Sequence, residues 1–185
     1  MPKTYPTNFV GDFLLGDNIK ENLDALTVIW NVEDKRGIRS VRKPIIVLCA
    51  AIIEAILHDF FFRIKEFTRE GVDRIEREFA EFLRSKDNDN LQFFIDQSRK
   101  HQLFGDGSDG LYKNLDKLAE LRNRIHIQNV KLSKPDRECD AFTQDYQKMA
   151  EKTLEGIIRH MVNDYNRKQE DHVGGFTLPW DSHFQ

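Results

Sequence analysis

Cysteine is scarce in this chain, with two residues among 185. Cys49 lies in an apolar run, where a free thiol usually packs as an inert core residue. The spacing between Cys49 and Cys139 fits neither a zinc site nor a disulfide framework. Residues 1–13 also lack the apolar segment of a signal peptide. These absences predict a chain kept in a reducing, cytoplasmic environment.

The chain also lacks a strong net charge, which is only −3. A general polycation is therefore excluded, and any contact with nucleic acid must come from a local basic patch. The composition is 39% hydrophobic and 32% charged, which is typical of a globular protein and not of a disordered one. At this length we expect about one domain with a sizeable core.

Apolar residues recur at helical spacing along most of the chain, and no segment shows a convincing strand pattern. The sequence therefore predicts an all-α bundle of five to six helices. We expect an irregular N-terminal arm at 1–16, one helical domain at 17–168 and an irregular C-terminal tail at 169–185. Phe176 and Trp180 are candidates to dock that tail. The predicted helices span approximately residues 17–34, 44–70, 72–84, 91–101, 111–129 and 135–168.

The predicted helix at 44–70 is the most apolar segment and is long enough to cross a bilayer. Four polar residues interrupt it, so a buried central helix is the better interpretation and we expect no membrane: Glu54, His58, Asp59 and Arg63. Glu54 and His58 share a face with Ala51, a small residue that would allow another helix to approach. Because an unpaired buried carboxylate is costly, we expect Glu54 to pair with a cation.

Two polar residues interrupt the hydrophobic pattern of the predicted helix at 111–129. Leu111, Leu115, Leu118 and Ile125 define an apolar face, and a helical wheel places Arg122 and His126 near its middle. Two charged or titratable groups one turn apart on such a face need a partner or a ligand. One interpretation is structural, with Arg122 paired to Glu54 and His126 bonded to a carbonyl. The other is a phosphate site, in which Arg122 and His126 act on a phosphodiester.

Metal and phosphate-loop chemistry are poorly supported by the remaining motifs. The GDGSDG loop at 105–110 lacks the Lys-Ser/Thr pair of a phosphate-binding loop and the twelve-residue calcium-loop pattern with its terminal Glu, so we interpret it as a connector. The His58-Asp59 pair has no further ligand in a suitable pattern. We therefore predict no metal and no cofactor.

The segment LAELRNRIHIQN resembles the signature helix of HEPN domains, in which an Arg-Asn dipeptide precedes a histidine. This resemblance implies a HEPN-like helical bundle that acts as a homodimer on RNA. It also implies a metal-independent endoribonuclease of a toxin–antitoxin or antiviral defence system, with an antitoxin or other protein as a further partner. The implied catalytic residues are Arg122 and His126, supported by Asn123 and Glu54. Arg122 and His126 enclose three residues where the family usually has four to six, which favours the alternative of a non-catalytic RNA-binding or protein-interaction module.

A basic run connects the first two predicted helices, with five Lys or Arg residues in nine positions. It is either an RNA-backbone patch or a solvated turn. The candidate RNA-binding residues are those of this run, one residue within the predicted helix at 111–129 and one just after it: Lys35, Arg36, Arg39, Arg42, Lys43, Arg124 and Lys131.

Overall fold

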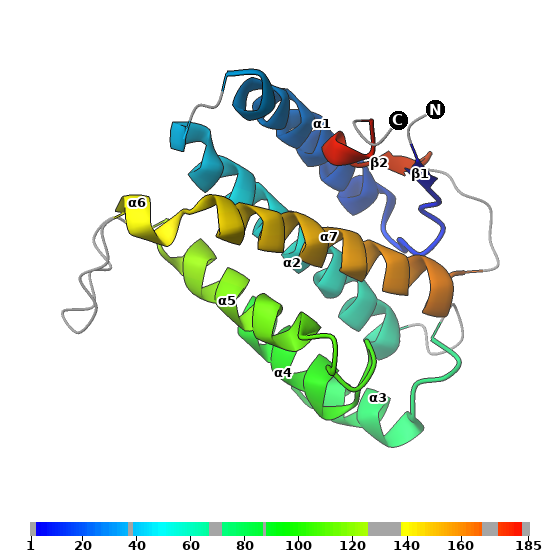
Figure 1. Ribbon diagram of the computed structural model, residues 1–185. Helices are drawn as coiled ribbons and strands as arrows, with labels where there is room; N and C mark the ends of the chain where they lie inside the picture. Colours follow the sequence, from blue (N-terminus) through cyan, green and yellow to red (C-terminus); the bar gives the residue numbers. More distant parts are fainter. Residues whose placement is uncertain are drawn as a thin grey trace.

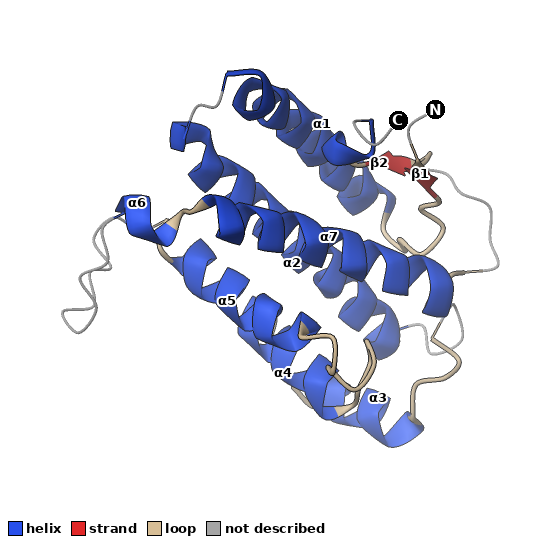
Figure 2. Cartoon of the chain, in the orientation of Figure 1, coloured by secondary structure: helices blue, strands red, loops and turns tan. Residues whose placement is uncertain are grey.

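The computed structural model describes residues 3–36, 39–66, 72–86, 88–125, 138–167 and 174–182. Within these ranges it confirms the all-α bundle, with six helices of eight residues or more and a two-stranded sheet (Figures 1 and 2). The helices are α1 (Phe13–Arg36), α2 (Arg42–Glu66), α3 (Arg77–Arg84), α4 (Leu91–Lys100), α5 (Leu111–Asn123), the single turn α6 (Glu138–Ala141) and α7 (Gln144–Asp164). Short 3-10 turns, η1 (Arg39–Val41) and η2 (Pro179–Ser182), precede α2 and follow the sheet.

Helix α2 lies at the centre of the bundle and packs against α1, α7, α5, α3 and α4. Half of its residues are buried, which explains why its sequence is apolar nearly all round. The long stretch Arg39–Glu66 passes a test for a membrane span by length and composition alone. Of its most apolar window, 61% is buried inside the bundle, and the core helix of a soluble protein passes the same test. Its length and composition are therefore only weak evidence that this helix crosses a membrane.

Helices α1 and α7 cover α2 with regularly spaced apolar faces. On α1, Ile19, Leu23, Leu26 and Trp30 are buried at the predicted helical spacing. The prediction of one continuous last helix is wrong in one respect, because the helix is interrupted between α6, which ends at Ala141, and α7, which begins at Gln144. The Thr143 side chain accepts a hydrogen bond from the Tyr146 amide at 3.3 Å and so caps a new helix.

The GDGSDG loop joins α4 to α5 as a connector. Gly105, Gly107 and Gly110 all have φ near +80°, a region that favours glycine. The Asp106 carboxylate accepts from the Ser108 amide and the Asp109 carboxylate accepts from the Leu111 amide, both at 2.9 Å. The amide–carboxylate bond also lowers the pKa of Asp106. These local bonds account for the residue types of the loop.

The chain termini are more ordered than predicted. Thr4–Tyr5 (β1) pairs antiparallel with Phe176–Thr177 (β2), so the expectation of two irregular arms without strands is wrong at this point (Figure 2). Helix α1 begins at Phe13 and not at Asp17. Phe176 and Trp180 are 1% and 6% exposed, and this burial confirms that they dock the tail.

A buried ion pair ties the N-terminal segment to the end of α2. The Asp59 carboxylate accepts from Arg63 Nε at 3.1 Å and from the backbone amides of Gly11 and Asp12 at 3.0 Å. Both side chains are almost fully buried, at 2% exposure for Arg63 and 3% for Asp59. A Cβ at Gly11 would lie 2.8 Å from Arg63 Cδ, so the segment can approach this closely only with glycine. This contact fixes where the chain enters α1.

Candidate functional site

The predicted pairing of Glu54 with a cation is confirmed by an ion pair between α2 and α5. Arg122 Nη2 donates to Glu54 Oε2 at 2.7 Å, and the two residues are 68 positions apart in the sequence. Arg122 Nη1 also donates to Asn123 Oδ1 at 3.4 Å, a longer contact. Three candidate site residues from two separate helices therefore lie together: Glu54, Arg122 and Asn123.

The position of Arg122 differs from the sequence prediction. Its side chain is 39% exposed, and that of Glu54 is 23% exposed, so the pair lies at the edge of the core and not in the middle of a buried stripe. Helix α5 ends at Asn123, and Ile125, predicted to be buried, is 43% exposed. Arg122 lies in the last turn of α5, where the helix dipole favours a cation. The guanidinium is thus held by Glu54 and still accessible to a solute.

Two nominated residues, His126 and Lys131, lie outside the residues that the structure describes. The same holds for the side chains of Lys35 and Arg36, although both belong to the last turns of α1. The arrangement of Arg122 with His126 consequently stays a prediction.

The described part of the basic run lies at the same end of the bundle as Arg122. The end of α1, η1 and the start of α2 contact one another there, and α5 ends on the same side of the bundle (Figure 1). Glu54, which binds Arg122, lies twelve residues beyond Arg42, so about 18 Å of α2 separates the two positions. Arg39 is exposed, whereas Arg42, Lys43 and Arg124 are partly buried. Lys43 Nζ lies 5.2 Å from the centre of the Phe142 ring, a cation–π contact that occupies part of this side chain. The exposed Arg39 and the partly buried Arg124 fit either an RNA patch or a solvated turn.

Sequence reasoning missed the extent of the uncovered face of α2. The expectation that another helix approaches the face of Ala51 and His58 is wrong, because both residues are exposed, and the series of exposed residues continues to Phe62, which is 45% exposed. Successive spacings of four and three residues, through Ala55, place these residues on one side of the helix. The helical spacing was present in the sequence, but Phe62 lies in a run of three phenylalanines and was not singled out. Phe60 and Phe61 are the buried members of that run.

The described residues offer no metal site, since no group of three or more His, Cys, Asp or Glu side chains lies close enough to share an ion. Cys49 is fully buried, and burial raises the pKa of its thiol, which confirms the prediction of an inert core cysteine. Neither finding supplies a nucleophile or a ligand next to Arg122.

No family model, curated protein or solved structure matches this chain. The function is therefore argued from the chain's own residues, starting from the Glu54–Arg122 pair, a polar contact between two helices that also faces solvent.

Proposed function

We propose that this protein binds RNA through the end of the bundle that carries Arg122, and that it cleaves RNA there without a metal. The observation that carries the proposal is the Glu54–Arg122 ion pair. It holds a guanidinium at the end of a helix, with its position set by a carboxylate and 39% of the side chain accessible. Partly exposed Arg124, two residues beyond Arg122, adds positive charge beside it, and Arg39 is a further exposed cation before the start of α2. The HEPN resemblance of the segment around Arg122 supports the same function.

The proposed chemistry divides two tasks between Arg122 and His126. A forked guanidinium can donate two parallel hydrogen bonds to a phosphate and stabilise the charge that develops on it during cleavage. An imidazole can accept the proton of the 2′-hydroxyl or donate one to the leaving oxygen, because it titrates near neutral pH. Glu54 orients Arg122, and Asn123 supports the same guanidinium. Defence against invading nucleic acid, or the toxin half of a toxin–antitoxin pair, is the proposed setting.

A non-catalytic RNA-binding or protein-interaction module is the second candidate. The specific observation in its favour is that three residues separate Arg122 from His126. In addition, Glu54 offsets the charge of Arg122, as expected of a pair with a structural role.

A nuclease assay in EDTA tests the proposal against this alternative. We expect the wild-type protein to cut single-stranded RNA when divalent ions are chelated, because neither proposed group is a metal ligand. His126→Ala should abolish cleavage while binding persists, as it removes the proton-transferring group alone. Arg77→Ala, which alters a 90% exposed side chain on α3, is the control for a changed surface charge. Binding without cleavage by the wild type would support the module instead.

We also propose that the active species is a homodimer, with the α5 ends of two copies flanking a shared cleft. A single Arg122 lies beside Glu54 and leaves little net positive charge, whereas two copies would bring paired cations to one RNA strand. The exposed Ile125 and Ala51 provide apolar surface near the pair. Light scattering should report about twice the monomer mass of 21.8 kDa. A monomer at high micromolar concentration would exclude this assembly.

A further inference from the structure

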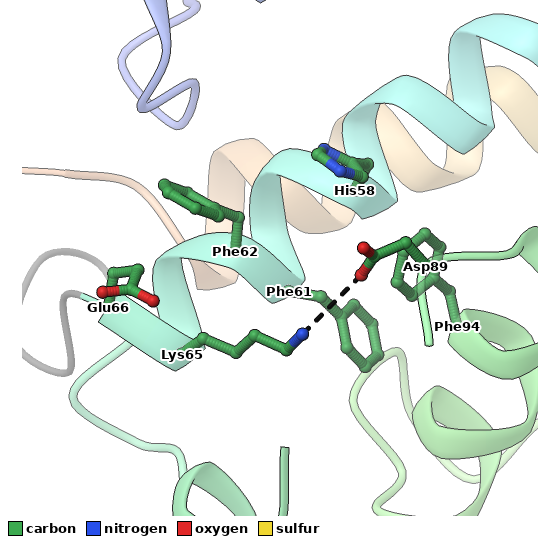
Figure 3. A pocket seen from close by; sticks show the side chains of 7 residues that line it. All are labelled: His58, Phe61, Phe62, Lys65, Glu66, Asp89 and Phe94. Carbon is green, nitrogen blue, oxygen red and sulfur yellow. Dashed lines mark ion pairs between the residues drawn. The ribbon is translucent and has the colours of Figure 1, made fainter. Parts of the chain in front are cut away.

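A small hollow lies at the second half of the uncovered α2 face. It has a volume of about 180 Å³ and is lined by His58, Phe61, Phe62, Lys65, Glu66, Asp89 and Phe94 (Figure 3). His58 and Phe62 project from the same side of α2, and Lys65 points towards Asp89, with 3.6 Å between Lys65 Nζ and Asp89 Oδ1. The His58 ring meets the Phe94 ring edge-on, with 6.1 Å between their centres. The hollow thus combines accessible rings with polar groups at its rim.

The hollow lies on the same face of α2 as Glu54, the partner of Arg122. His58 is one turn beyond Glu54 and Phe62 is two turns beyond it, so at 1.5 Å per residue these positions lie about 6 and 12 Å along the helix. A polymer that places a phosphate at Arg122 and follows α2 therefore reaches the hollow within a few residues of its chain. The partner of Arg122 and the hollow therefore lie along one side of α2.

The groups around the hollow fit a nucleobase better than a phosphate. Asp89 and Glu66 are acidic and Lys65 is already paired with Asp89, so the rim offers no excess positive charge. The same groups can donate to and accept from the edge of a planar base, and Phe62 and His58 offer faces for stacking. The hollow is smaller than typical drug-sized pockets of roughly 300–1,000 Å³, which suits one ring system.

We propose that this hollow receives one unpaired base of a single-stranded RNA whose backbone passes Arg122. The proposal rests on the proposed function and adds a substrate class to it. Bases inside a duplex are stacked on one another and cannot enter, whereas unpaired bases can be turned out onto an aromatic side chain. The protein should accordingly prefer single strands to duplexes.

Fluorescence anisotropy with one labelled RNA, single-stranded or annealed to its complement, tests the inference. Phe62→Ala should weaken binding of the single strand by roughly 5- to 150-fold, the usual effect of losing one stacked base, and leave duplex binding unchanged. Phe62→Trp should retain affinity because it keeps an aromatic face, and Phe62→Leu should not. Val28→Ala, which changes a 65% exposed apolar side chain on α1, should bind as the wild type does. Unchanged melting temperatures would show that all variants are folded.

The failures of the two proposals are distinguishable. If Arg122→Ala weakens RNA binding while Phe62→Ala binds single strands as the wild type does, the base site is excluded and the proposed function stands. If Phe62→Ala weakens binding of single strands and duplexes equally, stacking of an unpaired base is likewise excluded. If the wild type binds no RNA, the proposed function fails and the base site fails with it.

Discussion

Replacing Asp59 by alanine is expected to lower the free energy of unfolding by about 3–5 kcal/mol, the usual effect of removing one partner of a buried ion pair. Arg63 would stay charged at 2% exposure, because a guanidinium does not lose its proton in proteins. The amides of Gly11 and Asp12 would lose their acceptor at the same time. Since domains are stable by only about 5–15 kcal/mol, the variant should unfold at much lower denaturant concentration.

Glu81→Ala is the matched control for Asp59→Ala. It removes the acid from another pair at i and i+4, in which Arg77 Nε lies 2.8 Å from Glu81 Oε1 with the side chains 90% and 54% exposed. Exposed helical pairs contribute roughly 0.3–0.5 kcal/mol, so this variant should be close to the wild type. Hydrogen exchange adds a local measurement, because the Gly11 and Asp12 amides should exchange faster in Asp59→Ala alone. A loss below about 1 kcal/mol, with protected amides, would show that the pair does not hold this segment.

Most of the helical fold was predictable because burial repeats at the helical period. Ile19, Leu23 and Leu26 identify the inner face of α1 without reference to any other element. The Glu54–Arg122 pair was predictable for a different reason. An acid in an apolar helix needs a cation, and Arg122 was one of two groups expected on an inward face.

Other contacts leave no pattern in the sequence. Asp59 is bound by backbone amides from a segment 47 and 48 positions earlier, and a backbone amide carries no residue-type signal. The β1–β2 pair joins Thr4 to Thr177 through strands of two residues each, too short to show alternation. Ile125 was wrongly predicted to be buried because the predicted helix at 111–129 continued past Asn123, where α5 ends. The Glu54–Arg122 contact was predictable because a carboxylate in an apolar helix needs a cation. Features that depend on where a helix ends, or on hydrogen bonds to backbone amides, were not predictable in this way.

Arg122→Ala is expected to reduce RNA cleavage by roughly 100- to 1,000-fold, the usual effect of removing one donor that stabilises developing charge in a transition state. The variant should stay folded, because the Glu54–Arg122 pair is 23% and 39% exposed and such accessible pairs contribute at most about 1 kcal/mol. The loss would therefore be catalytic, and a thermal melt close to the wild type would establish this. Binding should also weaken, with the slope of log affinity against log salt falling by about one.

Arg122→Lys separates the shape of the guanidinium from its charge. Lysine keeps the positive charge but loses the planar fork that binds a phosphate through two donors. The salt slope should then stay near the wild-type value while cleavage remains low. Glu54→Gln should lower cleavage less than Arg122→Ala does, because Glu54 positions the guanidinium and does not touch the phosphate. If Arg122→Ala cuts RNA at the wild-type rate, Arg122 serves the fold through Glu54 alone, and the ribonuclease proposal loses the residue on which it rests.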